Sequence, residues 1–131
     1  MTVLDTHAFI WAWMEPERLS TAAVEAIARA RSAGGLAIAS ITVWEVAMLI
    51  ERGRLRVFGT PERWIETAIS GLGTSVIEIT AAIATISVRL VEPIAKDPAD
   101  RLIAATAIAL GAPLVTADER LRAGLPSLAV W

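Results

Sequence analysis

The amino-acid sequence predicts a three-layer α/β/α fold, in which a mostly parallel central sheet lies between two layers of helices. Short runs of β-type residues, over 2–4, 36–39, 75–79, 113–116 and 127–130, alternate along the chain with longer helical patterns. Hydrophobic residues make up 55% of the chain, which is enough to cover both faces of a sheet. The 131 residues contain no repeat and no linker, so we expect a single domain over 1–131.

Start and stop residues delimit the helices between these runs. Ser20 or Thr21 can cap an alanine-rich helix over 22–33, and Thr60 can cap a helix over 61–70 that begins with proline. Further helical patterns cover 42–52 and 80–91.

The strongest start signal precedes the last long helix. Asp97 can cap this helix, Pro98 takes its first position, and Asp100 lies in its first turn. An alanine-rich run then continues to Leu110, and Gly111 ends it. This segment is therefore the clearest helix in the sequence.

The composition excludes several classes of protein. There is no cysteine, so disulfides, thiolate metal sites and thiol nucleophiles are excluded. No signal peptide begins the chain, and we expect a cytoplasmic protein. The longest uncharged stretch, 102–117, contains Gly111 and Pro113 and falls short of the roughly 20 apolar residues that span a membrane. The net charge of −2 gives no general attraction to nucleic acid.

Four carboxylates follow apolar segments or begin helices, although they are spread over most of the chain: Asp5, Glu45, Asp100 and Asp118. Asp5 follows the first strand and Asp118 follows the run over 113–116, and the carboxyl edge of an open α/β sheet is where ligands bind. Helices that begin at this edge can bring the other two acids to it. Because gathered like charges need cations, we expect the four acids to bind Mg²⁺ or Mn²⁺, which prefer oxygen ligands.

Each acid also has an ordinary structural explanation. Asp97 and Asp100 can be helix-start residues that interact with the helix dipole. Glu45 can close a capping box with the sequence TVWE, and Asp118 can be a turn residue. Asp5 is harder to explain in this way, because an acid directly after a buried strand is costly unless it is solvated, paired or metal-bound.

The single histidine and the arginines are less informative. His7 is the only histidine in the chain, which excludes a two-histidine metal site. We expect it to pack or hydrogen-bond beside Trp11. Arginines near the acids can contact the phosphates of a nucleic acid, or they can be ordinary surface residues and ion-pair partners: Arg52, Arg54, Arg56 and Arg101.

Five short motifs occur in a specific order: LDTH at 4–7, SITVWE at 40–45, RGRL at 52–55, DPADRLIAATA at 97–107 and LVTAD at 114–118. In this order and spacing the chain resembles PIN-domain ribonucleases, and specifically the VapC toxins of type II toxin–antitoxin systems, over almost its whole length. One departure is Lys96, where relatives often have histidine.

The resemblance implies a PIN-like fold and a metal site. Its acids would be Asp5, Glu45, Asp100 and Asp118, supported by the Thr6 and Thr116 hydroxyls, with Asp97 as a further candidate. The implied activity is that of an endoribonuclease toxin, in which Mg²⁺ or Mn²⁺ activates a water and polarises the scissile phosphate. The implied partners are RNA, a cognate VapB-like antitoxin and a second copy of the chain.

Two alternatives remain open. A phosphatase with an aspartyl nucleophile would need a second acid two residues after Asp5, where the chain has His7. A catalytically inactive PIN-like module that binds RNA or protein would not need the complete acidic set. The sequence therefore favours the ribonuclease.

Overall fold

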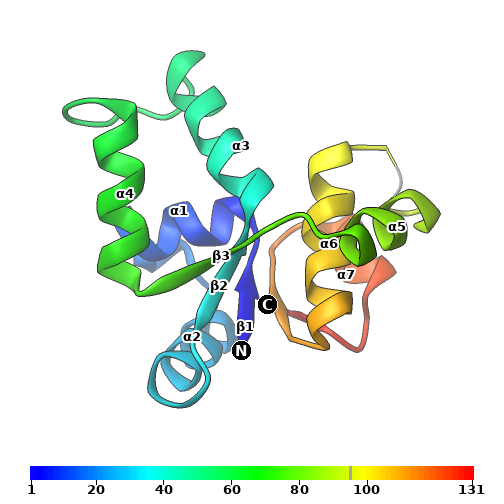
Figure 1. Ribbon diagram of the computed structural model, residues 1–131. Helices are drawn as coiled ribbons and strands as arrows, with labels where there is room; N and C mark the ends of the chain where they lie inside the picture. The colour runs from blue at the N-terminus through cyan, green and yellow to red at the C-terminus, as the bar shows by residue number, and fades with distance from the viewer. Residues whose placement is uncertain (95) are drawn as a thin grey trace.

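The computed structural model describes residues 1–94 and 96–131, which form a five-stranded sheet covered by helices on both faces (Figure 1). The strands are β1 (Thr2–Leu4), β2 (Leu36–Ala39), β3 (Thr74–Ile77), β4 (Leu114–Val115) and β5 (Ala129–Val130). The helices are α1 (Thr6–Met14), α2 (Thr21–Ala33), α3 (Ser40–Glu51), α4 (Pro61–Leu72), α5 (Ala81–Arg89), α6 (Pro98–Leu110) and α7 (Glu119–Gly124), with a 3-10 turn, η1, at Pro16–Arg18. The predicted α/β fold class is confirmed.

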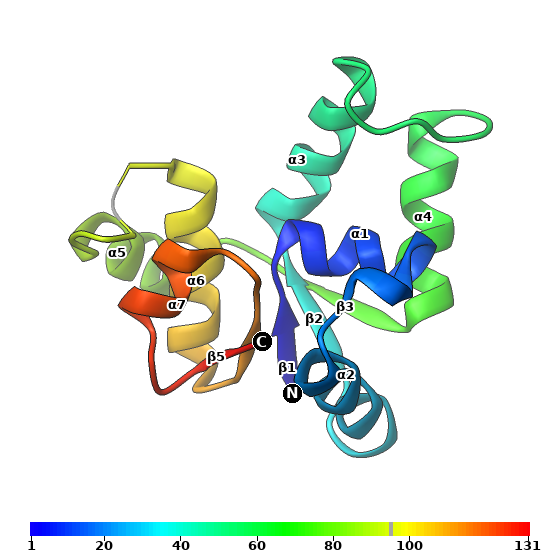
Figure 2. The ribbon, with the colours of Figure 1, turned by 180° about the vertical axis from the view of Figure 1, so that it is seen from behind.

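The two helical layers pack on opposite faces of the sheet because successive strand residues point to opposite sides. Leu4 belongs to a core cluster with α1, α2 and α4, whereas Val3 belongs to a second cluster with α6 and α7. Ile38 and Ala37 on β2 divide in the same way. Figure 2, seen from behind, shows α6 and α7 on one side of the strands and α1, α2 and α4 on the other. All four of these strand residues are at most 1% exposed.

The strand order places a binding edge at the centre of the sheet. The order is β3-β2-β1-β4-β5, and every neighbouring pair is parallel. From β1 the chain adds β2 and β3 on one side and β4 and β5 on the other, so the direction of winding reverses between β1 and β4. In open α/β sheets, ligands bind beyond the carboxyl ends of the strands at such a reversal.

The predicted elements match the observed ones closely where local signals exist. Strands β1 and β2 have the predicted limits, and Ser20, Thr60 and Asp97 cap helices through their side chains as expected. Gly111 ends α6 in the left-handed region, with φ 58°, a conformation that glycine adopts without strain.

Helices α1 and α7 were not predicted. The α1 sequence, THAFIWAWM, is apolar on almost all sides and so lacks the one-sided pattern that marks a surface helix. Helix α7 has only six residues, which is too short for such a pattern to be recognised. None of the helices in residues 1–94 and 96–131 is long and apolar enough to cross a membrane.

Candidate metal centre

Asp5 and Asp118 follow the neighbouring strands β1 and β4, between which the direction of winding reverses. Asp5 follows β1, its N–H donates to the carbonyl of Val115 on β4 at 3.1 Å, and its side chain caps α1 by accepting from the Ala8 N–H at 2.7 Å. Asp118 caps α7 and accepts from the N–H groups of Arg120 and Leu121. Asp118 is therefore a helix cap, and its bond from the Arg120 N–H, two residues further on, is also the bond that a turn residue makes.

The Thr116 hydroxyl connects these two acids. It accepts a hydrogen bond from the Asp118 N–H at 3.0 Å and donates one to the Asp5 carboxylate. Thr116 is fully buried, so this short stretch after β4 is held rigidly. The supporting position expected for Thr116 agrees with this geometry.

Glu45 reaches the same edge from α3. The Thr6 hydroxyl donates to the Glu45 carboxylate at 2.5 Å and lies 3.2 Å from the Thr42 hydroxyl. The capping-box hypothesis for Glu45 is wrong, because α3 starts directly from β2 at Ser40, with Ala39 at the cap and no side-chain capping bond. Thr42 thus lies inside the helix and is fully buried, and Glu45 points to α1 instead of its own N-terminus.

Asp97 and Asp100 come from the start of α6. Asp97 accepts from the Ala99 N–H at 2.9 Å, as a capping residue should. Asp100 lies one turn further on, with Ile103 on the same side of the helix, and both line the cavity described next.

These side chains surround one cavity of about 210 Å³, which we call the acid cavity. Five carboxylates line it, together with Thr6, His7 and Ile103: Asp5, Glu45, Asp97, Asp100 and Asp118. They come from the starts of α1, α6 and α7 and from the second turn of α3. The structure therefore brings together all four acids expected in the site, and adds Asp97 to them although it also caps α6.

Burial and mutual repulsion raise the pKa values of three of these acids. Burial is the largest cause for Asp5, whose pKa is raised although hydrogen bonds from Thr116 and Ala8 oppose the change. Burial also raises the pKa of Glu45, against the hydrogen bond from Thr6. For Asp100, burial and then the charges of Asp97 and Asp118 raise the pKa from 3.8 to about 7. The cavity thus concentrates negative charge that a cation would neutralise.

The raised pKa of Asp100 predicts a pH-dependent stability of the metal-free protein. Between about pH 4 and about pH 7 the unfolded chain ionises this group while the folded protein still holds the proton. Stability from this group is therefore present at low pH and is lost as the pH rises through about 7. The full shift corresponds to about 4 kcal/mol, and solvent screening of this half-buried group reduces the expected loss to about 1–2 kcal/mol.

Asp100→Asn should remove this dependence. Urea unfolding in chelator, at about pH 5 and about pH 8, should show the wild type losing stability relative to the variant as the pH rises. An equal change in both proteins would contradict the assigned position of Asp100 among like charges.

The donor set suits a hydrated hard cation. Within the described residues, no three acidic or histidine side chains are grouped closely enough to hold one metal ion as they stand. Mg²⁺ keeps several waters in proteins and is held by one or two carboxylates together with substrate phosphates. A cavity lined by carboxylate and hydroxyl oxygens fits that kind of binding.

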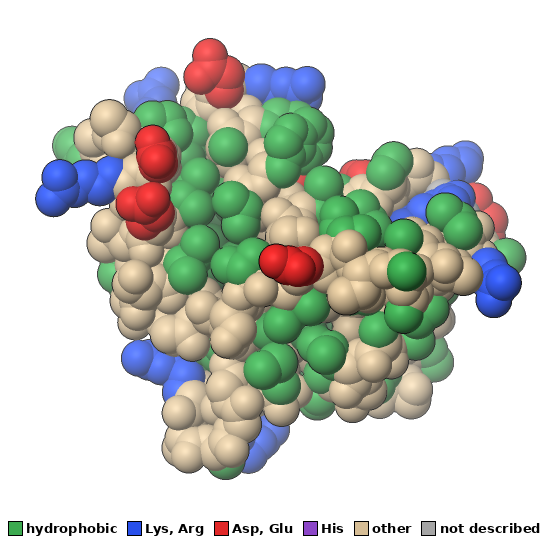
Figure 3. Space-filling model, viewed as in Figure 1, with side chains coloured by type: hydrophobic (Ala, Val, Ile, Leu, Met, Phe, Trp, Pro, Cys, Tyr) green, Lys and Arg blue, Asp and Glu red, His purple; other side chains and the backbone are tan. Residues whose placement is uncertain are grey.

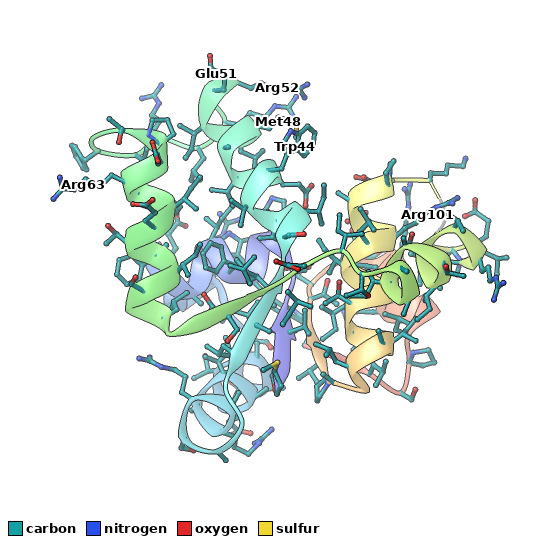
Figure 4. The ribbon with its side chains drawn as sticks, in the orientation of Figure 1. Trp44, Met48, Glu51, Arg52, Arg63 and Arg101 are labelled. Atoms are coloured by element: carbon teal, nitrogen blue, oxygen red, sulfur yellow. The ribbon has the colours of Figure 1, made fainter. Side chains whose placement is uncertain are left out.

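The arginines expected to contact RNA do not line the acid cavity within the described part of the chain. Arg54 lines a neighbouring cavity that shares His7 with it, whereas Arg52, Arg56 and Arg101 do not line the acid cavity in the described part of the chain. Figure 4 shows Arg52 at the far end of α3 from the strands and Arg101 on α6. His7 does contact Trp11, with ring centroids 5.7 Å apart, but its side chain is exposed and not packed into the core.

Sequence reasoning missed two residues of this region. Thr42 touches Thr6, and Ile103 forms the apolar part of the lining. Their positions three residues before Glu45 and three residues after Asp100 place them on the same helix faces as those acids, and this spacing is the signal that could have identified them.

Comparison with protein families gives a match to the PIN domain over residues 2–124. Among curated proteins, the chain is 41% identical to Ribonuclease VapC22 of Mycobacterium tuberculosis (strain ATCC 25618 / H37Rv) over 120 residues, which cover 92% of this chain and 88% of that protein.

Solved structures share the fold at low sequence identity. A chain in a toxin–antitoxin complex from Klebsiella pneumoniae superposes with a TM-score of 0.69 at 23% identity, covering 100% of this chain and 97% of that one. A chain in VapBC2 from Rickettsia felis, bound to a DNA fragment from the promoter, has a TM-score of 0.64 at 18% identity and coverages of 89% and 86%. A chain in FitAcB from Neisseria gonorrhoeae has a TM-score of 0.61 at 21% identity and coverages of 98% and 96%.

Proposed function

Because this chain belongs to the PIN-domain family, we propose that it is a VapC-type endoribonuclease, the toxin of a type II toxin–antitoxin pair. The relative that is 41% identical over most of both chains is a ribonuclease. The observation that carries the proposal is the acid cavity, where five carboxylates gather at the reversal point of the sheet. An inactive binding module would gain nothing from gathering charges that repel one another.

We assign the catalytic metal site to Asp5, Glu45, Asp100 and Asp118. When bound, Mg²⁺ or Mn²⁺ supplies an activated water and polarises the scissile phosphate. The carboxylates hold and orient the cations, and they are not nucleophiles. Thr6 fixes the Glu45 carboxylate, and Thr116 fixes Asp5 relative to Asp118.

Burial raises the pKa of Asp5, and the hydrogen bonds from Thr116 and Ala8 oppose that rise by favouring the charged form, which is the form that binds a cation. Burial and the neighbouring acids raise the pKa of Asp100 in the metal-free protein, and a bound cation would lower it again. Asp97 caps α6 and adds charge at the edge of the cavity, so we assign it a supporting role.

A cognate VapB-like antitoxin is the expected partner, since each of two similar structures is described as a toxin–antitoxin or VapBC assembly. Support for a protein partner comes from a mainly apolar cavity of about 430 Å³ beside the acids, lined by Trp44 and Met48 of α3 and by Pro98 and Ala99 of α6. Trp44 is 57% exposed. Figure 4 shows Trp44 and Met48 along one side of α3, and Figure 3 shows hydrophobic side chains over much of this face. Exposed apolar surface of this kind is typical of interaction sites.

Three further features belong to the proposal. Residues 1–131 would form one PIN domain, because β5 lies beyond the matched residues 2–124 and yet pairs with β4. The protein would act as a homodimer. It would work in the cytoplasm, where its RNA substrate is found.

Expression in bacteria tests the proposed function directly. Expression of the wild-type protein should arrest growth, and expression of Asp5→Asn should not. Co-expression of the cognate antitoxin should restore growth to cells that express the wild-type protein. Asparagine also caps helices, so the variant should fold, and circular dichroism checks this. Equal growth arrest by both proteins would favour the inactive binding module over the nuclease.

A further inference from the structure

A second cavity adjoins the acid cavity at His7, which lines both. It has a volume of about 360 Å³ and lies between α1, the η1 turn and the end of α3. Trp11, Arg18 and Arg54 are among its lining residues, and we call it the Trp11 cavity. The assigned metal site does not use it.

Aromatic rings and a guanidinium group gather around Trp11. The His7 and Trp11 ring centroids are 5.7 Å apart with the planes at 51°, and Trp131 lies 5.9 Å from Trp11 at the same angle. The Arg18 guanidinium carbon lies 4.5 Å from the Trp11 ring centroid. Trp11 itself packs against the core of the α1 side, so its ring is held in place. Flat groups of this kind are the surfaces on which unstacked bases are bound.

The charge of the Trp11 cavity is the reverse of that of the acid cavity. Arg18 and Arg54 line it against a single acid, Glu15, which lies 3.5 Å from Arg18 in an exposed pair. Exposed pairs of this kind are weak, and a guanidinium that lies over an aromatic ring can still donate through its N–H groups to a phosphate. RNA that approaches five carboxylates needs a positively charged surface beside them. The Trp11 cavity provides such a surface, and it meets the acid cavity at His7.

We propose that the Trp11 cavity binds one unstacked nucleobase of the RNA, in a nucleotide next to the scissile phosphate. His7 and Trp11 contact the base, and Arg18 and Arg54 face the phosphate on the side away from the metal. The inference rests on the proposed ribonuclease activity and names the subsite that positions its substrate. Mixed aromatic and guanidinium lining favours a nucleotide over an apolar peptide segment.

The test uses single-stranded RNA oligonucleotides that span a cleavage site, chosen by sequencing the 5′ ends made by the full-length protein. In each oligonucleotide one nucleotide near the cleaved bond is replaced by an abasic ribose. For wild-type protein one abasic position should lower kcat/KM about 10-fold, mainly by raising KM. For Trp11→Ala the same replacement should change kcat/KM by about twofold or less, because the contact is already lost.

Two further variants keep the test decisive if Trp11→Ala folds poorly. The His7 side chain is exposed, so His7→Ala should fold and should also weaken the effect of that abasic position. Arg54→Ala should lower the slope of log affinity against log salt by about 1, measured by fluorescence anisotropy in an Asp100→Asn background, in which cleavage is strongly slowed. The matched control is Arg31→Ala, which removes the same charge from the last turn of α2, at the opposite edge of the sheet, and should leave the slope unchanged.

The outcomes separate this inference from the function on which it rests. If folded wild-type protein with Mg²⁺ or Mn²⁺ cleaves no RNA, the proposed function fails. If it cleaves RNA but every abasic oligonucleotide behaves alike, only the base-binding subsite is overturned. If Trp11→Ala retains the abasic effect but escapes inhibition by the antitoxin, the Trp11 cavity is a protein-docking site and the inference is wrong.

Discussion

Asp5→Asn and Asp100→Asn should each lower kcat/KM for RNA cleavage by about 10²–10⁴-fold. Both carboxylates line the acid cavity, and loss of a metal ligand removes several kcal/mol of transition-state stabilisation, at about 1.4 kcal/mol for each factor of ten. Neither change should unfold the domain. Asparagine can still cap α1 in place of Asp5, and at Asp100 the substitution removes a charge that its neighbours repel.

Two other variants serve as controls in the same cleavage assay. Asp97→Asn keeps a capping residue at the start of α6 and should cost about 10-fold, in line with a supporting position. Glu119→Gln removes the same charge from an exposed residue next to Asp118 that does not line the acid cavity, so its activity should match the wild type. Undiminished cleavage by both Asp5→Asn and Asp100→Asn would rule out the proposed mechanism.

Removal of divalent metal should abolish cleavage, and Mg²⁺ or Mn²⁺ should restore it. The physical reason is the cluster of five carboxylates, which repels the phosphate of RNA until cations neutralise it. Cleavage of a labelled RNA is measured before chelation, in chelator, and after each metal is returned. Full activity in chelator would show that the acids do not act through a metal.

Metal binding should also be visible without any activity. A ligand that binds only the folded state at 100 times its Kd stabilises that state by about 2.7 kcal/mol, so Mg²⁺ should raise the melting temperature of the wild type. The increase in melting temperature should be smaller in Asp5→Asn than in the wild type, and in Glu119→Gln it should equal that of the wild type. An equal increase in all three proteins would place the bound metal outside the acid cavity.

Local sequence signals predicted most of the secondary structure. Caps, prolines and glycines act on backbone groups a few residues away, so the limits of β1, β2 and α6 could be inferred without knowing the fold. The same reasoning failed for Thr42 and Glu45, whose capping-box spacing occurs within a helix that had already begun at Ser40. The capping motif was present in the sequence, but its position in the helix was set by the strand before it.

The fold class and the acids that could meet at one edge of the sheet follow from the amino-acid sequence, because alternating strands and helices allow few arrangements and Asp5 and Asp118 follow strands. How those acids are held depends on the packing of distant segments. Glu45 accepts from Thr6, 39 positions away in the chain, Asp97 joins the acid cavity while still capping α6, and His7 connects that cavity with the Trp11 cavity. These contacts depend on how α1, α3 and α6 pack on the sheet, and interactions between distant segments leave no local pattern in the sequence from which they could be read.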